Sequence, residues 1–152
     1  MRVDLCWISA LLLVCCAPVY AQSTGGASAG AATNPSNPAV TVELNKLETA
    51  DKACRAYFVV GNQLPDPLKE LQLDVYIFDP KGVIAHRVGL SFTDVRPNRT
   101  KVVLFDLADL ACGDIGRLLV NEVLACSSAK GPVDHCADRL AVTTKTAARF
   151  EY

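Results

Sequence analysis

The stretch LQLDVYIFDPKG, residues 71–82, decides the fold class. Its side chains alternate between two faces up to a tight-turn sequence, with Leu71, Leu73, Val75 and Ile77 on one face and Gln72, Asp74, Tyr76 and Phe78 on the other. A period of two is the pattern of a β-strand buried on one face. Asp-Pro followed two residues later by glycine favours a tight turn. The sequence therefore predicts a strand over 71–78 that reverses direction at 79–82.

Six further strand-like runs surround this stretch, and turn residues separate most of them. The run 83–93 places Ile84, Val88, Leu90 and Phe92 on one face, and the run 101–107 is apolar on both faces. A strand that is apolar on both faces is typical of a central or well-covered position. Residues 108–116 are expected to form a loop or a single helical turn. The remaining strands are expected at 40–45, at 53–60 before a Gly61-Asn62 turn signal, at 117–126 and from 140 to the C-terminus.

Seven short strands without a helical period predict an all-β domain, and we expect an immunoglobulin-like β-sandwich of about seven antiparallel strands. A transmembrane β-barrel is the competing architecture, because Phe150 and Tyr152 alternate at the C-terminal end. Barrel strands alternate lipid-facing apolar and lumen-facing polar residues. The run 102–105 does not, and Asp74 and Asp106 lie within the strands, so the sandwich is favoured.

The first 21 residues have the features of a secretory signal peptide. Arg2 provides the positive start, and the apolar run from Trp7 to Cys16 is too short to span a bilayer. Small residues before the junction predict cleavage after Ala21, which implies export to the periplasm. A lipidated N-terminus at Cys15 or Cys16 is the alternative, but the residues before them do not suit a lipidation site.

Residues 22–38 contain only small and polar residues and proline, so we expect a flexible linker that could act as a tether of about 20–25 Å. Residues 39–152 are long enough and apolar enough for one folded domain, with no transmembrane segment in the mature chain. The whole chain carries 15 Lys and Arg against 16 Asp and Glu. It has no basic cluster, which argues against nucleic acid as a partner.

Three of the seven cysteines lie in the signal peptide, and the four that remain are Cys54, Cys112, Cys126 and Cys136. An even number of cysteines in an exported chain predicts disulfides, and four allow three pairings. We favour Cys54–Cys112 together with Cys126–Cys136, the second closing a short loop that contains Gly131-Pro132. Cys54–Cys126 together with Cys112–Cys136 is the rival pairing.

No catalytic, cofactor-binding or metal site is predicted. The strongest candidate ligands, Asp134-His135-Cys136, match no standard metal-site spacing, and Cys136 is better used in a disulfide. His86 shares the parity of Val88, so it is expected on the core side or at a strand end. The chain has neither a Cys-x-x-Cys redox motif nor a Gly-x-Ser-x-Gly nucleophile elbow.

The mature chain resembles a family of small exported proteins of Gram-negative bacteria labelled "Tat pathway signal sequence domain" proteins. The resemblance implies an exported four-cysteine domain and brings no established activity, cofactor or catalytic residue. The twin-arginine pair in that label is absent here. The residues that carry the resemblance are 42–45, Cys54 to Asn62, 77–79 with Gly82, 107–112, 115–121, Cys126 and Cys136.

We expect a periplasmic binding or interaction module whose partner is a periplasmic or envelope protein, because sandwich domains present loops and sheet edges to partners. The residues expected at the interaction surface are Tyr57, Tyr76, Arg96 and Arg99. The alternatives are an envelope-tethered structural or accessory component and an enzyme whose site is not visible in the sequence. A pocket on which Asp106, Asp134 and His135 converge would favour the enzyme.

Overall fold

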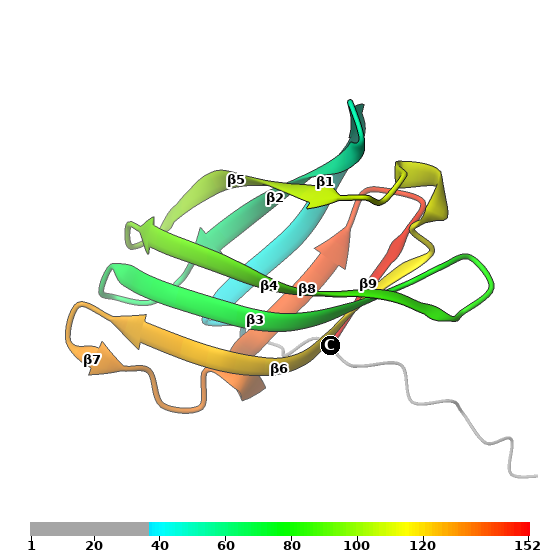
Figure 1. Cartoon of the computed structure of the whole chain (residues 1–152). Helices are drawn as coiled ribbons and strands as arrows, with labels where there is room; N and C mark the ends of the chain where they lie inside the picture. Colours follow the sequence, from blue (N-terminus) through cyan, green and yellow to red (C-terminus); the bar gives the residue numbers. More distant parts are fainter. Residues whose placement is uncertain (1–36) are drawn as a thin grey trace, which may run out of the picture.

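The computed structural model describes residues 37–152, so the predicted signal peptide and almost all of the predicted linker lie outside the described residues. Nine strands and two short 3-10 turns follow one another along the chain (Figure 1). Their bounds are β1 Val40–Ala50, β2 Ala53–Asn62, β3 Leu68–Phe78, β4 Ile84–Val95, β5 Arg99–Ala108, η1 Cys112–Asp114, β6 Arg117–Ser128, β7 Gly131–Pro132, η2 Ala137–Arg139, β8 Leu140–Thr144 and β9 Arg149–Glu151.

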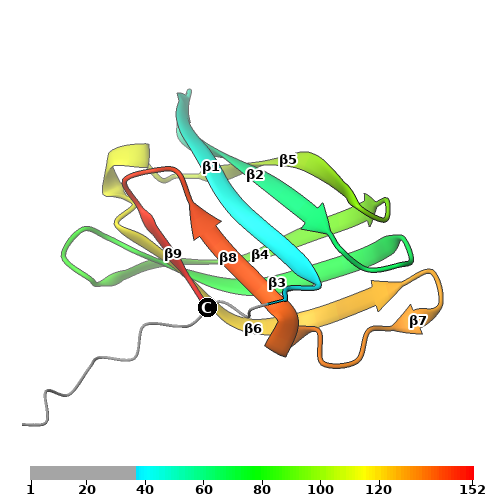
Figure 2. The same ribbon diagram turned by 180° about the vertical axis from the view of Figure 1, so that it is seen from behind.

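The strands form two sheets that pack face to face as a β-sandwich, which confirms the predicted fold class (Figures 1 and 2). Sheet A has the order β5-β2-β1-β8. Sheet B has the order β4-β3-β6-β7, and β9 also pairs with β6. Strands β4 and β5 are therefore edge strands of opposite sheets, and a short loop connects them. This arrangement places two free strand edges on the same side of the sandwich.

The hydrophobic core lies between the two sheets. It contains the side chains that the alternating sequence pattern predicted to face inward. The inward-facing residues of β3 are completely buried: Leu71, Leu73, Val75 and Ile77. An aromatic cluster of Phe58, Phe92, Phe105 and Phe150 joins the two sheets through edge-to-face contacts with ring centroids 5.4–5.8 Å apart. This is the preferred geometry for aromatic pairs, because the positive ring edge meets the negative ring face.

Both disulfides of the favoured pairing are present. Cys54 in β2 is bonded to Cys112 in η1, and Cys126 in β6 is bonded to Cys136, which directly precedes η2. The loop with a single helical turn that was expected over 108–116 is present, with η1 as the turn and Ala108 still part of β5, and the first bond holds it against the start of β2. The rival pairing is excluded.

The predicted position of the run 101–107 was wrong. It belongs to β5, which pairs with β2 alone and forms the edge of sheet A. Its inward residues enter the core, but on the outer face Val102 is 56% exposed and Leu104 is 48% exposed. A strand apolar on both faces can be buried on both, or it can carry an exposed apolar surface. Which strands pair with it in the sheet decides whether such a strand is covered or exposed.

Ile84 was also predicted on the wrong face. A β-bulge shifts the register, so that Ile77 lies opposite His86 whereas Phe78 lies opposite Ile84. One extra residue in a strand reverses the face of every residue beyond it. Ile84 is consequently 55% exposed, while His86 is half-buried opposite a core residue, as its parity with Val88 predicted.

The C-terminal strand is divided between the two sheets. β8 pairs with β1 in sheet A and β9 pairs with β6 in sheet B, and both pairings are parallel. The other five pairings are antiparallel, as expected. The hydroxyl groups of Thr144 and Thr146 both donate to the Ala148 carbonyl oxygen, which stabilises the turn between the sheets. The single predicted strand from 140 therefore becomes two.

Candidate functional site

The outer face of sheet A carries an apolar surface along its β5 edge. Tyr57 lies opposite Leu104, and Val59 lies opposite Val102, on the neighbouring strands β2 and β5. We call these four residues the β5 edge patch. The two β5 members are exposed, and the two β2 members are half-buried. An apolar patch at the free edge of a sheet is a feature of partner-binding surfaces.

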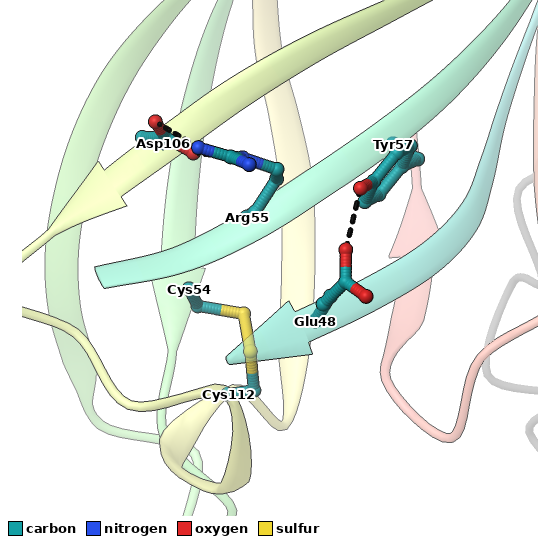
Figure 3. The surroundings of a disulfide bond; sticks show 6 residues. All are labelled: Glu48, Cys54, Arg55, Tyr57, Asp106 and Cys112. Atoms are coloured by element: carbon teal, nitrogen blue, oxygen red, sulfur yellow. Dashed lines mark hydrogen bonds and ion pairs between the residues drawn. A yellow bond between two sulfur atoms is a disulfide. The ribbon is translucent and has the colours of Figure 1, made fainter. Parts of the chain in front are cut away.

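Charged side chains border the β5 edge patch toward one end of the strand (Figure 3). The Arg55 guanidinium donates two hydrogen bonds to the Asp106 carboxylate, at 2.7 and 2.9 Å, across the β2–β5 pair. The Tyr57 hydroxyl donates to Glu48 on β1, and Glu48 also accepts from Lys46 Nζ at 2.8 Å. The patch therefore has the apolar centre and polar rim that protein interfaces show.

These hydrogen bonds shift the pKa values of the polar residues that border the patch. The two bonds from Arg55 lower the pKa of Asp106. The bond from Lys46, followed by the bond from Tyr57, lowers the pKa of Glu48. The bond to Glu48 in turn raises the pKa of Tyr57. At neutral pH the carboxylates are ionised and Tyr57 keeps its proton, so the rim presents constant charges rather than an acid–base pair.

The Cys54–Cys112 disulfide holds the same end of sheet A. Cys54 lies opposite Leu107 in the β2–β5 pair, directly beside Arg55 and Asp106 (Figure 3). The bond fixes η1 and the chain that follows β5 to the start of β2. The C-terminal end of β5 is thus covalently supported.

Asn62 supports the opposite end of β5, where Arg99 begins the strand. The Asn62 side chain is fully buried and donates to the carbonyl oxygens of Asp66 and Val95, while it accepts from the amide of Leu64. Its own carbonyl oxygen accepts from the amide of Asn98. Gly61 and Asn62 had been interpreted as a turn signal, but they belong to β2. Asn62 ties two neighbouring loops together rather than forming a turn.

The loop held by Asn62 presents two arginines. Arg96 and Arg99 are exposed and, among residues 37–152, their side chains have no hydrogen-bond or ion-pair partner. They line a shallow pocket of about 480 Å³ with Asp94, Thr100 and Lys101. The Asp94 carboxylate is held by Lys69 at 2.9 Å, which lowers its pKa. The N-terminal end of β5 is therefore basic.

The structure brings three of the four predicted surface residues to one side of the molecule. Tyr57 lies in the β5 edge patch, Arg99 begins β5, and Arg96 lies in the loop before it. Tyr76 lies on the outer face of sheet B, where the Arg87 guanidinium is 5.5 Å from its ring centroid. Tyr57 and Tyr76 thus face away from each other and cannot share one interface.

Sequence reasoning missed Val102 and Leu104. Their alternation with Val103 and Phe105 was visible, but it was interpreted as burial on both faces. The available signal was the position of the run between the Arg96-Pro97-Asn98 turn and a long irregular segment, which is compatible with an edge strand. The sequence could not show which neighbour β5 lacks.

A second polar cluster lies on the outer face of sheet B. Asp74 is only 4% exposed, yet its carboxylate accepts from Arg87 at 2.7 and 3.2 Å and from the Asn121 amide at 2.9 Å. The Arg87 bond is the largest cause of a lowered Asp74 pKa, which outweighs the opposing effect of burial. Since the three residues come from β3, β4 and β6, this cluster joins strands within the sheet.

The residues considered for catalysis do not converge. His135 and Asp138 form an exposed pair at 3.2 Å beside the second disulfide. Asp106 and His86 both line a pocket of about 390 Å³ at the β4–β5 side, but the Asp106 carboxylate is occupied by Arg55. Within residues 37–152 no three His, Cys, Asp or Glu side chains group as metal ligands do.

Comparison with known proteins supports the fold. No protein-family model and no curated protein matches the chain, so the resemblance to the exported four-cysteine family stays a prediction. The solved structure of IrmA from Escherichia coli is similar to this chain, with a TM-score of 0.52 and 10% sequence identity. The match covers 68% of this chain and 89% of IrmA. At this identity the likeness shows a shared β fold and nothing about activity.

The disulfides bear on the cellular location of the protein. The two disulfides are compatible with a periplasmic or extracellular location, where disulfides form and persist. In the part of the chain from 37 to 152, no helix has the length and apolar character to cross a bilayer.

Proposed function

We propose that this protein is a periplasmic protein-interaction module of the bacterial envelope that binds its partner through the β5 edge patch. In this proposal the signal peptide is removed after Ala21, and residues 22–38 connect the sandwich to the new N-terminus. The observation that carries the proposal is an edge strand with two exposed apolar side chains, Val102 and Leu104, beside a free strand edge.

The backbone of β5 is open to pairing along its free edge. An edge strand offers a row of N–H and C=O groups that a partner strand can pair with, and proteins usually block such edges with charges, prolines or bulges. Along β5 the residues from Val102 to Phe105 contain none of these features, and the pairing register between β2 and β5 runs without a bulge. A partner that added a strand here would gain main-chain hydrogen bonds and would cover Val102 and Leu104.

The surface is also held in shape before any partner arrives. The Cys54–Cys112 disulfide supports one end of β5, and the Asn62 contacts support the other. A binding surface that is already ordered loses less conformational entropy on association, so more of the contact energy appears as affinity. This arrangement supports a binding role for β5 more than for the outer face of sheet B, where Arg87 already covers Tyr76 and Asp74.

Site-specific photo-crosslinking in the producing cell tests the proposal. We expect Val102→p-benzoylphenylalanine to yield a discrete crosslinked product, because this position would face the partner. Val83 is the matched control, since it is an exposed valine (62%) in the turn before β4 rather than on β5. A further Leu104→Lys substitution should abolish the product. Equal crosslinking at positions 102 and 83, or none at position 102, would contradict the proposal.

A further inference from the structure

We infer that the partner of the β5 edge patch is a second copy of the same chain, paired with it through antiparallel β5 strands around a two-fold axis. This inference rests on the proposed function of the patch and names its occupant. Such pairing would extend sheet A of one copy into sheet A of the other, giving a continuous eight-stranded sheet from two four-stranded halves.

The middle of β5 carries both exposed apolar residues. The strand runs from Arg99 to Ala108, so Val102 and Leu104 lie close to its centre and share the outer face. In antiparallel pairing, residues directly opposite each other lie on the same face. A pairing centred on Val103 therefore places Val102 against Leu104 of the second copy, and Leu104 against Val102. Both exposed apolar residues of each copy become covered by the same contact.

The two ends of β5 carry charges of opposite sign. The N-terminal end of β5 is basic, with Arg96, Arg99 and Lys101 exposed. The C-terminal end is acidic. Asp106 is already held by Arg55, but Asp109 is exposed and, within the described chain, its carboxylate has no hydrogen-bond or ion-pair partner. Arg96 and Arg99, whose side chains have no partner among the described residues, thus lie at the opposite end of β5 from Asp109. Lys101 is already engaged, since its ammonium donates to the Thr93 carbonyl oxygen at 2.7 Å.

Only the antiparallel orientation of two β5 strands brings a basic end beside an acidic end. A pairing centred on Val103 places Arg99 opposite Leu107 of the second copy, two residues from Asp109. β5 ends at Ala108, and Asp109 directly follows it. Two residues span at most about 7 Å of chain, a distance that an arginine side chain can bridge. A parallel arrangement would instead bring the two basic ends together. The charge pattern is therefore self-complementary in the antiparallel orientation, which is the property of a two-fold interface.

Sedimentation equilibrium of the mature, disulfide-intact protein tests the inference. We expect a reversible monomer–dimer equilibrium, and we expect Val102→Lys to raise the dissociation constant at least about tenfold, because each dimer would bury two lysines. Val83→Lys is the control and should leave it unchanged. A wild-type protein that stays monomeric at high concentration, or a Val102→Lys variant that dimerises like wild type, would overturn the inference.

A charge exchange tests the orientation separately. Arg99→Asp and Asp109→Arg should each weaken association, and the double variant should recover it because the pairs are restored in reversed polarity. Thermal unfolding of each variant checks that the domain still folds. If the double variant is weaker than either single variant, the antiparallel arrangement is wrong.

Hydrogen exchange of the unmodified protein gives a measurement that needs no substitution. Amides of β5 that face the free edge should exchange more slowly at high protein concentration, whereas those of β4 should not change. Exchange rates of β5 that are independent of concentration would contradict the pairing. The results also separate the two proposals: a monomeric protein that crosslinks to a different protein through position 102 refutes self-association and leaves the proposed binding surface in place.

Discussion

At the scale of single residues, Asp74 shows how a polar side chain can occupy a covered position in a sheet. Its carboxylate is nearly inaccessible, and it accepts hydrogen bonds from Arg87 and Asn121 on the two neighbouring strands. A covered carboxylate is tolerated when such donors replace the lost water. In the sequence, Asp74 appeared only as a polar position on the alternate face of 71–78.

This residue makes a testable contribution to acid stability. Its pKa is held below the ordinary value of 3.8 in the folded protein. The contribution is therefore present above that value and is lost as the pH falls through the lower folded-state pKa. We expect Asp74→Asn to lower the unfolding temperature at neutral pH, and the gap from wild type to narrow below about pH 4.

The matched control is Asp94→Asn. Asp94 also has a lowered pKa and one lysine partner, but both side chains of that pair are exposed. Solvent and salt weaken such surface pairs, so the effect should be much smaller at every pH. Thermal unfolding from pH 7 to pH 3 measures both variants, and a gap for Asp74→Asn that widens toward low pH would show that the sign is wrong.

At the scale of elements, each disulfide joins an irregular segment to a strand. Cys54–Cys112 links β2 to η1 across 58 residues of chain, whereas Cys126–Cys136 links β6 to the start of η2 across 10. A crosslink restricts the unfolded chain more strongly when it closes a longer loop. The first disulfide should therefore contribute more to the free energy of unfolding than the second.

Paired alanine variants measure this difference. By the loop-entropy relation, Cys54→Ala/Cys112→Ala should lose about 4 kcal/mol and Cys126→Ala/Cys136→Ala about 3 kcal/mol. Urea unfolding of both variants and the wild type gives the values. A larger loss for the second pair would mean that local packing around β7, rather than the length of the closed loop, controls the stabilisation.

At the scale of the whole molecule, the sandwich explains why one side is the binding candidate. Sheet A ends in β8 on one side, where β9 crosses to sheet B and closes the gap between the sheets (Figure 2). On the other side, β5 is the edge strand of sheet A and β4 is the edge strand of sheet B. The exposed apolar residues of β5 lie on this open side, together with the basic loop.

Export would process the chain as a whole and leave a mature form with two disulfides. We expect the mass of the protein purified from the periplasm to correspond to a chain that begins at Gln22. Reduction should add two hydrogen atoms for each of the two disulfides. A chain that begins at an acylated Cys15 or Cys16, or one with four free thiols, would contradict the predicted processing and compartment.

The class of the fold and most strand positions followed from the sequence, because both depend on local properties. The disulfide pairing was narrowed to a favoured set and a rival, and the structure decided between them, since Cys54 and Cys112 are 58 residues apart in the chain. The alternation of apolar residues in 71–78 indicates a strand with one buried face, and the residues 79–82 indicate a turn. The even set of four cysteines predicted two covalent links. The sequence also predicted an interaction surface with Tyr57, Tyr76, Arg96 and Arg99. In the structure Arg96 and Arg99 are exposed and Tyr57 is half-buried on the same side, whereas Tyr76 lies on the other sheet.

The tertiary structure alone decided which strands are neighbours, and the main corrections follow from this. The edge position of β5 exposes Val102 and Leu104, the bulge in β4 turns Ile84 outward, and the return of β8 and β9 produces parallel pairings. Strand order and register arise from contacts between residues far apart in the chain. Hydrophobic periodicity reports how many faces of a strand are apolar, but it does not report what covers each face.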